Sequence, residues 1–310
     1  MAEEKDGKPA AEPLAEASPA VKEFMAESAL ANVAEDEAVA EESNFAAGHG
    51  FEGASFATAG PTGPYISFEH VFKSFGEFVV LQDVSFFVNP GETLCILGRS
   101  GVGKSVSLQI LMGFLKPDSG TVLVAGQDIA GLSEREMQEV RRKVTMVFQN
   151  GALFDSISVG ENVAFPLRER GNMQEDQIDQ VVRGLLEIVG VAGMENLLPS
   201  DLSTGMKRSV AIARALAAQP SAVLYDEPTT MVDPLMAHLL GNLIQRLKVQ
   251  LHLTSIVVTH DMRFAEKLAD RIVFLHEGKA RFFGTTAEMR ASQDPVLCEF
   301  LALDELVLPQ

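Results

Sequence analysis

Short apolar runs separated by helical patterns extend over most of this chain. Continuous apolar runs occur at 93–97, 144–148, 222–225, 255–259 and 272–275, a pattern typical of strands that are buried on both faces. Segments 104–117 and 235–251 instead carry apolar residues at helical spacing. Because strands and helices alternate, we expect an α/β fold in which a mainly parallel sheet is flanked by helices.

Two segments interrupt this alternation. Residues 66–72 alternate as in a half-buried strand and 79–88 offers one or two more, which predicts a small antiparallel β subdomain. From about 155 to 218 the pattern is mainly helical, with one apolar face formed by Ile178, Val181, Val182, Leu185, Leu186 and Val189. We expect this stretch to form a helical subdomain inserted into the sheet.

Three regions follow from these patterns. Residues 1–63 form an acidic, Ala/Glu-rich extension with few large apolar side chains, so we expect disorder there. Residues 64–286 form the folded domain, and residues 287–310 form a helical tail that contains several leucines. The tail is expected to pack on its own domain, and docking on a partner or on a second copy is the alternative.

Acidic residues clearly outnumber basic ones. The net charge is −18, and twelve acidic side chains against three lysines in residues 1–50 contribute −9 of it. Nucleic acid is therefore not expected as a partner, because neutralising phosphates requires clustered Lys and Arg. The same excess disfavours unaided binding to an anionic membrane surface. Any membrane-embedded part is expected in another chain, since no stretch reaches the ~18 apolar residues that span a bilayer.

The two cysteines, Cys95 and Cys298, are far apart in the sequence. Cys95 lies inside an apolar run, so we expect a buried and inert thiol. No structural disulfide and a reducing cytosolic setting are expected. The N-terminus has neither the charged and apolar regions of a secretory signal nor the composition of an organelle transit peptide.

A glycine-rich segment follows the apolar run 93–97. Gly98 to Ser105 reads GRSGVGKS and fits the pattern Gly-x-x-x-x-Gly-Lys-Ser, between a strand and a helix. Glycines let successive backbone N–H groups face a phosphate, and the start of the helix adds positive charge. Lys104 can reach the terminal phosphates, and the Ser105 hydroxyl can ligate Mg²⁺. The nucleotide-binding residues expected here are Gly98, Arg99, Ser100, Gly101, Val102, Gly103, Lys104, Ser105 and Val106.

Polar residues follow three of the other apolar runs. Asp226 and Glu227 end the run 222–225, where Asp226 can hold the Mg²⁺ hydration shell and Glu227 can orient or deprotonate a water. Gln149 follows 144–148, and its amide can touch both Mg²⁺ and the water. His260 closes the run 255–259. Taken alone, a Gln at such a position is most often an ordinary loop residue, and a lone His is more often structural than catalytic.

The segment Leu202–Lys207, LSTGMK, separates one family of phosphate-loop proteins from the others. Together with the motifs above, it makes residues 66–285 resemble the ATP-binding subunits of ABC transporters. The resemblance identifies Gly98–Ser105 as the Walker A loop, Gln149 as the Q-loop, and Asp226 and Glu227 as Walker B and the catalytic glutamate. It also assigns Phe75 to adenine stacking, Asp233 to the D-loop and His260 to the switch histidine.

The resemblance implies a mechanism with two copies. Nucleotide domains would dimerise head to tail, with each ATP and its Mg²⁺ held between the Walker A loop of one copy and the signature of the other. The residues acting in trans would be Ser203, Thr204, Gly205, Met206 and Asp233. Catalysis would depend on Glu227, His260, Gln149 and Lys104, and Mg²⁺ would be bound by Ser105, Gln149 and Asp226.

Two positions depart from the family pattern. The signature usually has two consecutive glycines, and Thr204 takes the place of the first; we expect activity to be retained. The D-loop usually reads Gly-Leu-Asp-Pro, but here Met231 and Val232 precede Asp233. This change is expected to alter coupling between the two sites.

Residues 148–169 and the ending Asp294–Leu301 are similar to the ATPases of Mla/Mce-type lipid transport systems. Those ATPases work with an MlaE-like integral membrane permease and an MCE-domain lipid-binding protein, which implies a position on the cytoplasmic face of the inner membrane. Phe154, Phe165, Pro166 and Leu167 would then form an apolar socket for the permease; alternatively, these residues only pack the helical insert.

Three other functions remain open at this point. The chain could be the ATPase of an importer for polar solutes such as amino acids, or a soluble ABC ATPase that takes no part in transport. A nucleotide-binding regulator that does not hydrolyse ATP is the third alternative.

Overall fold

Apolar runs along the chain become the strands of a central six-stranded sheet. The structure, a computed structural model, describes residues 63–171 and 173–306. The expectation of disorder therefore concerns residues that lie, apart from Gly63, outside the described part. The sheet has the order β10-β9-β3-β8-β7-β6. Its strands are β3 (Thr93–Leu97), β6 (Val144–Val147), β7 (Ala222–Asp226), β8 (Thr254–Thr259), β9 (Arg271–His276) and β10 (Lys279–Thr285).

Parallel pairing joins all of these strands except β10, which pairs with β9 in the antiparallel sense. All five residues of β3 and all six of β8 are buried, as expected for strands covered on both faces. The carboxyl ends of five strands consequently meet at one edge of the sheet. The expected mainly parallel α/β architecture is confirmed.

The second sheet has four strands in the order β2-β1-β4-β5, and its neighbouring strands are antiparallel. They are β1 (Ile66–Phe75), β2 (Phe78–Val88), β4 (Ser119–Val124) and β5 (Gln127–Asp128). The simple alternation expected over 66–72 is wrong, since Ile66, Ser67 and Phe68 are all buried. The register of β1 shifts after Phe68, and His70 has a φ of 52°, so a bulge interrupts the two-residue period.

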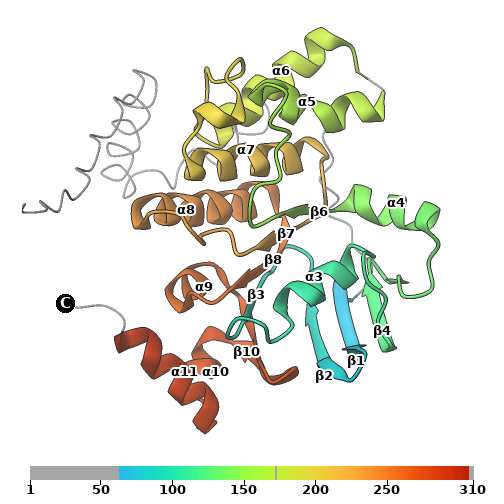
Figure 1. Ribbon diagram of the computed structural model, residues 1–310, viewed down its shortest axis with the longest axis vertical. Coiled ribbons are helices and arrows are strands. Elements are labelled where there is room, and N and C mark those ends of the chain that lie inside the picture. Colours follow the sequence, from blue (N-terminus) through green and yellow to red (C-terminus); the bar gives the residue numbers. More distant parts are fainter. Residues whose placement is uncertain (1–62, 172, 307–310) are drawn as a thin grey trace, which may run out of the picture. The chain divides into compact units, whose positions relative to one another are not determined.

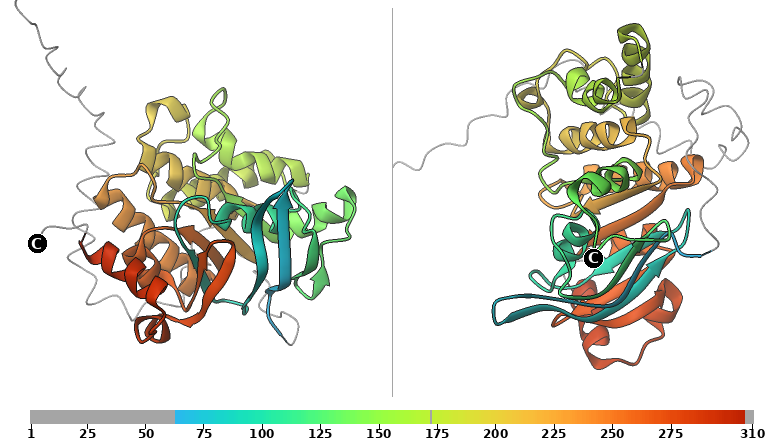
Figure 2. Two further views of the ribbon diagram at one scale, coloured as in Figure 1. Left: turned by 60° about the horizontal axis from the view of Figure 1, so that its bottom comes forward. Right: turned by 90° about the vertical axis from the view of Figure 1, so that its right-hand side faces the viewer.

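Helices cover the central sheet and form a separate group at one end. Figures 1 and 2 show α5, α6 and α7 grouped at the end of the domain opposite the antiparallel sheet and α10. The helices are α3 (Lys104–Leu111), α4 (Glu134–Lys143), α5 (Val159–Arg170), α6 (Glu175–Ile188), α7 (Thr204–Ala217), α8 (Pro234–Leu251), α9 (Met262–Leu268), α10 (Thr286–Arg290) and α11 (Pro295–Leu306). Ser133 and Glu136 form a capping box at the start of α4.

Some boundaries differ from the sequence pattern. The helix expected over 104–117 ends at Leu111, because Gly113 has a φ of 70° and turns the chain there. Strand β10 was not expected, since it has no long apolar run, whereas α10 falls almost entirely within the helical tail predicted over residues 287–310. The apolar face predicted for the inserted helices is confirmed, and its six residues are all buried in α6 or just after it.

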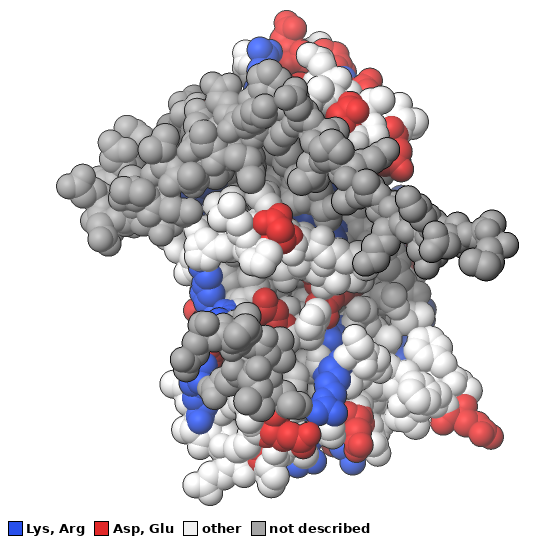
Figure 3. Space-filling model, turned by 60° about the vertical axis from the view of Figure 1, so that its left-hand side comes forward, with Lys and Arg blue, Asp and Glu red and all other residues white. Residues whose placement is uncertain are grey.

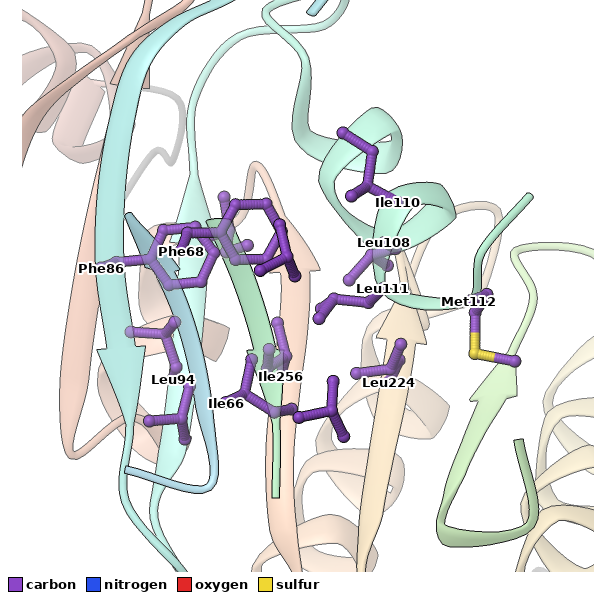
Figure 4. Packing of buried hydrophobic residues seen from close by; sticks show 14 of the residues in the cluster. Ile66, Phe68, Phe86, Leu94, Leu108, Ile110, Leu111, Met112, Leu224 and Ile256 are labelled. Carbon is purple, nitrogen blue, oxygen red and sulfur yellow. The ribbon is translucent and has the colours of Figure 1, made fainter. Parts of the chain in front are cut away.

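The hydrophobic core lies where the two sheets and α3 meet. The rings of Phe68 and Phe86 stack with centroids 4.4 Å apart, and Leu94, Leu224 and Ile256 from the central sheet belong to the same cluster (Figure 4). Burying each such side chain contributes about 1.5–3 kcal/mol. The core therefore holds the phosphate-loop strand β3 rigidly against both layers.

The C-terminal helix α11 packs on the domain itself. Leu297 is fully buried, and the Phe300 ring lies 4.9 Å from that of Phe274 on β9. Within the described residues, no helix is long and apolar enough to cross a bilayer. On the face shown in Figure 3, acidic and basic side chains are interspersed among neutral ones.

Replacing Leu224 with Ala should lower the free energy of unfolding by about 2–5 kcal/mol, because the cavity left in the centre of β7 cannot collapse fully. Chemical denaturation of the purified chain measures this change. Val249→Ala on the exposed face of α8 is the control and should stay within about 0.5 kcal/mol of wild type. An equal loss in the two variants would contradict the packing described here.

Candidate functional site

The site is built at the carboxyl edge of the parallel sheet. Leu97 pairs with Thr259, Asp226 with Val258, and Val147 with Tyr225. The residues that follow these strands therefore emerge side by side. They are Gly98 after β3, His260 after β8, Glu227 after β7 and Gln149 shortly after β6.

The loop from Gly98 to Gly103 folds back over β3 and leads into α3. Gly98, Gly101 and Gly103 have φ values of 152°, 81° and 104°, which side chains with a Cβ rarely adopt. A Cβ at Gly98 would lie 2.4 Å from the Leu275 carbonyl oxygen, so the loop rests directly on β9. A Cβ at Gly103 would clash with Leu81 and Val80 of β2, so the antiparallel sheet contacts the loop as well.

Lys104 is the buried cation of the site. Its side chain is only 5% exposed, and Nζ donates to the carbonyl oxygens of Gly98 at 2.7 Å and Arg99 at 3.1 Å. Glu227 Oε1 lies 3.4 Å from the same nitrogen. A buried ammonium requires such partners, because leaving one unpaired costs several kcal/mol. The lysine is thus held at the loop, where the expected terminal phosphates would lie.

Glu227 joins Lys104 to His260. Its Oε2 lies 2.8 Å from His260 Nδ1 and also accepts a hydrogen bond from Thr230 Oγ1 at 3.2 Å. The backbone of Glu227 has a φ of 48°, a strained value for this residue, and its N–H donates to the Val258 carbonyl on β8. The contacts with His260 and Thr230 therefore hold the Glu227 carboxylate in place despite the strained backbone.

Ser105 and Asp226 provide oxygen ligands close to each other. Ser105 Oγ donates to Asp226 Oδ1 at 2.9 Å, although β8 separates β7 from the phosphate-loop strand in the sheet. Burial raises the pKa of Asp226, the hydrogen bond from Ser105 lowers it, and the charge of Glu227 raises it. A hydroxyl and a carboxylate fit Mg²⁺, which prefers oxygen ligands and retains several waters or phosphate oxygens.

Not every expected site residue joins this cluster. Gln149 is exposed at the same edge and, among the described residues, hydrogen-bonds to neither Asp226 nor Glu227. Phe75 is half exposed at the end of β1, with Lys73 Nζ 5.5 Å from its ring centroid. Arg99, Ser100, Val102 and Val106 lie within the loop or on α3 as expected. Arg99 also pairs with Glu299 of α11 at 3.3 Å.

The signature segment forms the N-terminus of α7. Ser203 is the N-cap and its hydroxyl accepts from the Met206 N–H. Thr204 begins the helix without a positive φ, so the missing first glycine causes no backbone strain. Gly205 is packed against Met236, and the Met206 side chain is buried. Ser203 and Thr204 are exposed at this helix end, as is Asp233 at the N-cap of α8.

The structure also clarifies the second departure from the family pattern, which is at Met231. It has a φ of 61° and a side chain 86% exposed, at the position where the family pattern has glycine. Left-handed conformations favour glycine, so the methionine costs about 1 kcal/mol there.

Sequence reasoning missed three polar residues around the site. Thr230 contacts Glu227, and Arg208 and Arg214 on α7 donate to carbonyl oxygens of the segment after β6. Arg208 and Arg214 belong to the helix that the signature segment begins. The sequence indicates them only in that each is a charged residue among mostly apolar neighbours. Thr230 gives no signal in a single sequence.

Comparisons with known proteins agree with this geometry. Residues 81–230 match the protein family described as ABC transporter. The chain is 42% identical over 226 residues to the intermembrane phospholipid transport system ATP-binding protein MlaF of Haemophilus influenzae, covering 73% of this chain and 86% of that protein. It is 36% identical over 241 residues to the probable ribonucleotide transport ATP-binding protein mkl of Mycobacterium leprae, covering 78% of this chain and 70% of that protein.

A solved structure is similar over the same region. It is the dimeric structure of a post-hydrolysis state of the ATP-binding cassette MJ0796 bound to ADP and Pi. The TM-score is 0.66 at 31% identity, and the match covers 71% of this chain and 98% of that one.

Replacing Gly98 with Ala should weaken ATP binding at least tenfold, because the new Cβ meets the Leu275 carbonyl oxygen and displaces the loop. Equilibrium binding of a fluorescent ATP analogue measures the affinity. Gly131→Ala, outside the loop, is the control and should leave the affinity unchanged, since a Cβ there meets no atom within 4 Å. Equal affinities for Gly98→Ala and wild type would show that the loop does not rest on β9.

Proposed function

This chain belongs to the ABC transporter family as an ATP-binding and ATP-hydrolysing subunit, and from that premise we propose that it drives the movement of phospholipids or related lipids. It would work as a homodimer beneath an integral membrane permease, on the cytoplasmic face of the inner membrane. An MlaE-like permease and an MCE-domain lipid-binding protein would complete the assembly. The observation that carries the ATPase role is the contact of one carboxylate, Glu227, with both Lys104 and His260.

Each residue of that contact has a chemical role in hydrolysis. Lys104 would neutralise charge on the terminal phosphates of ATP from its position beside the Gly98 and Arg99 carbonyl oxygens. Glu227 would orient the attacking water and accept its proton. His260, exposed beside Glu227, would hold the carboxylate in place and contact the γ-phosphate. Phe75 would stack on the adenine.

Ser105 and Asp226 are the residues that would hold Mg²⁺. Gln149, which follows β6 at the same edge of the sheet, would complete the set. When bound, the ion would neutralise the charge that develops on the phosphate oxygens. Positive charge beside Asp226 would also offset the rise in its pKa that burial causes.

The exposed N-terminus of α7 would act on the nucleotide of a second copy. Ser203 and the Gly205 N–H lie at a helix start, which favours an anion. Thr204 and Asp233 are exposed for the same contact, whereas Met206 would act only by packing beneath it. Binding of ATP between two copies would close the dimer, and hydrolysis would open it.

The proposed contact with the permease is an exposed pair of aromatic rings. Phe154 and Phe165 are each 46% exposed, and their centroids lie 5.2 Å apart. Buried Asn162 holds Phe154 by accepting from its N–H and donating to its carbonyl oxygen. Leu167 is buried and cannot contribute to this surface. A rigid, apolar, exposed pair of this kind suits a hydrophobic helix of a membrane partner.

The lipid assignment rests on the similarity to MlaF, a phospholipid transport ATPase by name. A second candidate, transport of a polar solute, is favoured by the mkl relative, which is named for ribonucleotide transport. Affinity purification of the tagged chain in detergent from its native cell, followed by mass spectrometry of proteins and lipids, distinguishes the two. An MlaE-like permease with an MCE-domain protein and phospholipid supports the proposal, and a solute-type permease without lipid overturns the lipid assignment.

Glu227→Gln should lower the turnover number of ATP hydrolysis by about 10²–10⁴-fold, because the amide cannot accept the proton of the attacking water. Phosphate release from the purified chain measures turnover. Size-exclusion chromatography with ATP should also show a trapped dimer. Glu139→Gln on the exposed face of α4 is the control and should behave as wild type. Absence of turnover in both wild type and Glu227→Gln would favour a regulator that does not hydrolyse ATP, and equal measurable turnover in the two would show that Glu227 is not the catalytic base.

Replacing both Phe154 and Phe165 with Ser should reduce recovery of the permease at least tenfold in the same purification, because the apolar contact is lost. Val249→Ser removes an exposed apolar side chain on α8 and should leave recovery unchanged. Full recovery with the double variant would place the permease contact elsewhere.

A further inference from the structure

Arg208 is a buried cation without an acidic partner. It lies on α7 with 4% of its surface exposed, and none of the described acidic side chains forms an ion pair with it. Its Nη1 donates to the Phe148 carbonyl oxygen at 3.2 Å and its Nη2 to the Thr230 carbonyl oxygen at 3.4 Å, while Nε is buried with no partner. Burial lowers the pKa of this guanidinium. Two neutral carbonyls offset little of the cost of burying the charge.

The two carbonyls belong to the two loops of the active site. Phe148 directly precedes Gln149, and Thr230 lies between Glu227 and Asp233. The two segments leave neighbouring strands, β6 and β7. One planar guanidinium therefore joins them, which a lysine could not do with the same geometry.

Thr230 continues this connection to the carboxylate. Its carbonyl accepts from Arg208, its N–H donates to the Glu227 carbonyl at 3.2 Å, and its hydroxyl donates to Glu227 Oε2. That oxygen also contacts His260, so two groups fix Oε2 while Oε1 faces Lys104. Rotation of the Glu227 carboxylate is restrained from three sides.

Helix α7 holds the rest of the segment after β6 too. Arg214, further along the helix, donates to the carbonyl oxygens of Ala152 at 2.8 Å and Gly151 at 3.0 Å. The helix that begins with Ser203 and Thr204 is thus bonded to both loops that flank the nucleotide site of its own chain.

We propose that Arg208 and Thr230 are positioning residues for ATP hydrolysis: Arg208 holds the loops of Gln149 and Glu227 together, and Thr230 orients the Glu227 carboxylate toward the attacking water. This inference rests on the proposed hydrolysis at this site. It adds two residues that touch neither ATP nor Mg²⁺ and act only through Glu227 and the Phe148–Gln149 backbone.

The first test is a pair of substitutions at Thr230. Thr230→Val keeps the shape and removes the hydroxyl, so the turnover number should fall about tenfold, the effect of one hydrogen bond to a charged group. The KM for ATP should stay within about twofold, since nucleotide binding does not use this group. Thr230→Ser should restore most of the turnover. Equal turnover in Thr230→Val and wild type, or a loss confined to KM, would overturn the role of Thr230.

The second test replaces Arg208 with Met or Lys. Because replacing a buried charge with an apolar side chain is often neutral for stability, Arg208→Met should keep the thermal midpoint near wild type while turnover falls at least tenfold. Arg208→Lys should not restore it. The loss in the double variant Arg208→Met/Thr230→Val should be smaller than the product of the single losses, because both act through one loop.

Controls separate the possible failures. Arg183→Met on the exposed face of α6 is the matched control and should hydrolyse ATP as wild type does. Wild-type turnover in folded Arg208→Met, with only a lower thermal midpoint, would show a purely structural arginine. If the wild-type chain itself did not hydrolyse ATP, the proposed function would fail instead. If wild type were active and both single variants matched it, only this inference would fail.

Discussion

The parallel register of β3, β8, β7 and β6 is the constraint on which the site depends. Because Leu97 lies opposite Thr259 and Asp226 opposite Val258, the phosphate loop, His260 and Glu227 emerge at one edge without any long connection. The Lys104 ammonium, the Asp226 and Glu227 carboxylates and the His260 imidazole meet at this edge. Each of these polar groups therefore needs a hydrogen-bond or ion-pair partner. Lys104 forms an ion pair with Glu227 and donates to two carbonyl oxygens, and Asp226 accepts a hydrogen bond from Ser105. A one-residue shift of β7 would separate these groups.

The helical group of α5, α6 and α7 supports two segments that the central sheet does not hold. Strand ends place side chains, but the segments after β6 and β7 need further support, because Glu227 and Met231 both have positive φ. That support comes from α7, whose two arginines bond to four carbonyl oxygens in these segments. Phe154 lies in the segment after β6, its ring contacts that of Phe165 on α5, and Arg214 lies over the Phe154 ring. The proposed permease contact and the proposed catalytic carboxylate are therefore linked through one helix.

The fold was largely predictable, because long apolar runs and clear helical spacing reflect burial directly. The five parallel strands and the apolar face of α6 followed from local pattern. Strand β10 was not predictable, because it lies at the edge of the sheet and Gly284 is its one buried residue. The bulge at His70 depends on pairing with strands on both sides. The phosphate loop and the Asp226–Glu227 pair were identifiable as motifs. Arg208 and Thr230 were not, because their importance lies in carbonyl contacts that only the tertiary structure creates.

The burial of Cys95 has a practical consequence. The chain has two thiols; Cys95 is enclosed in β3, where burial raises its pKa, and Cys298 is exposed on α11. A maleimide dye added to the unmodified protein would therefore react at Cys298 alone. That residue is adjacent to Glu299, which pairs with Arg99 in the phosphate loop. The native sequence thus offers a single attachment point for a fluorophore beside the nucleotide site, without any engineered cysteine.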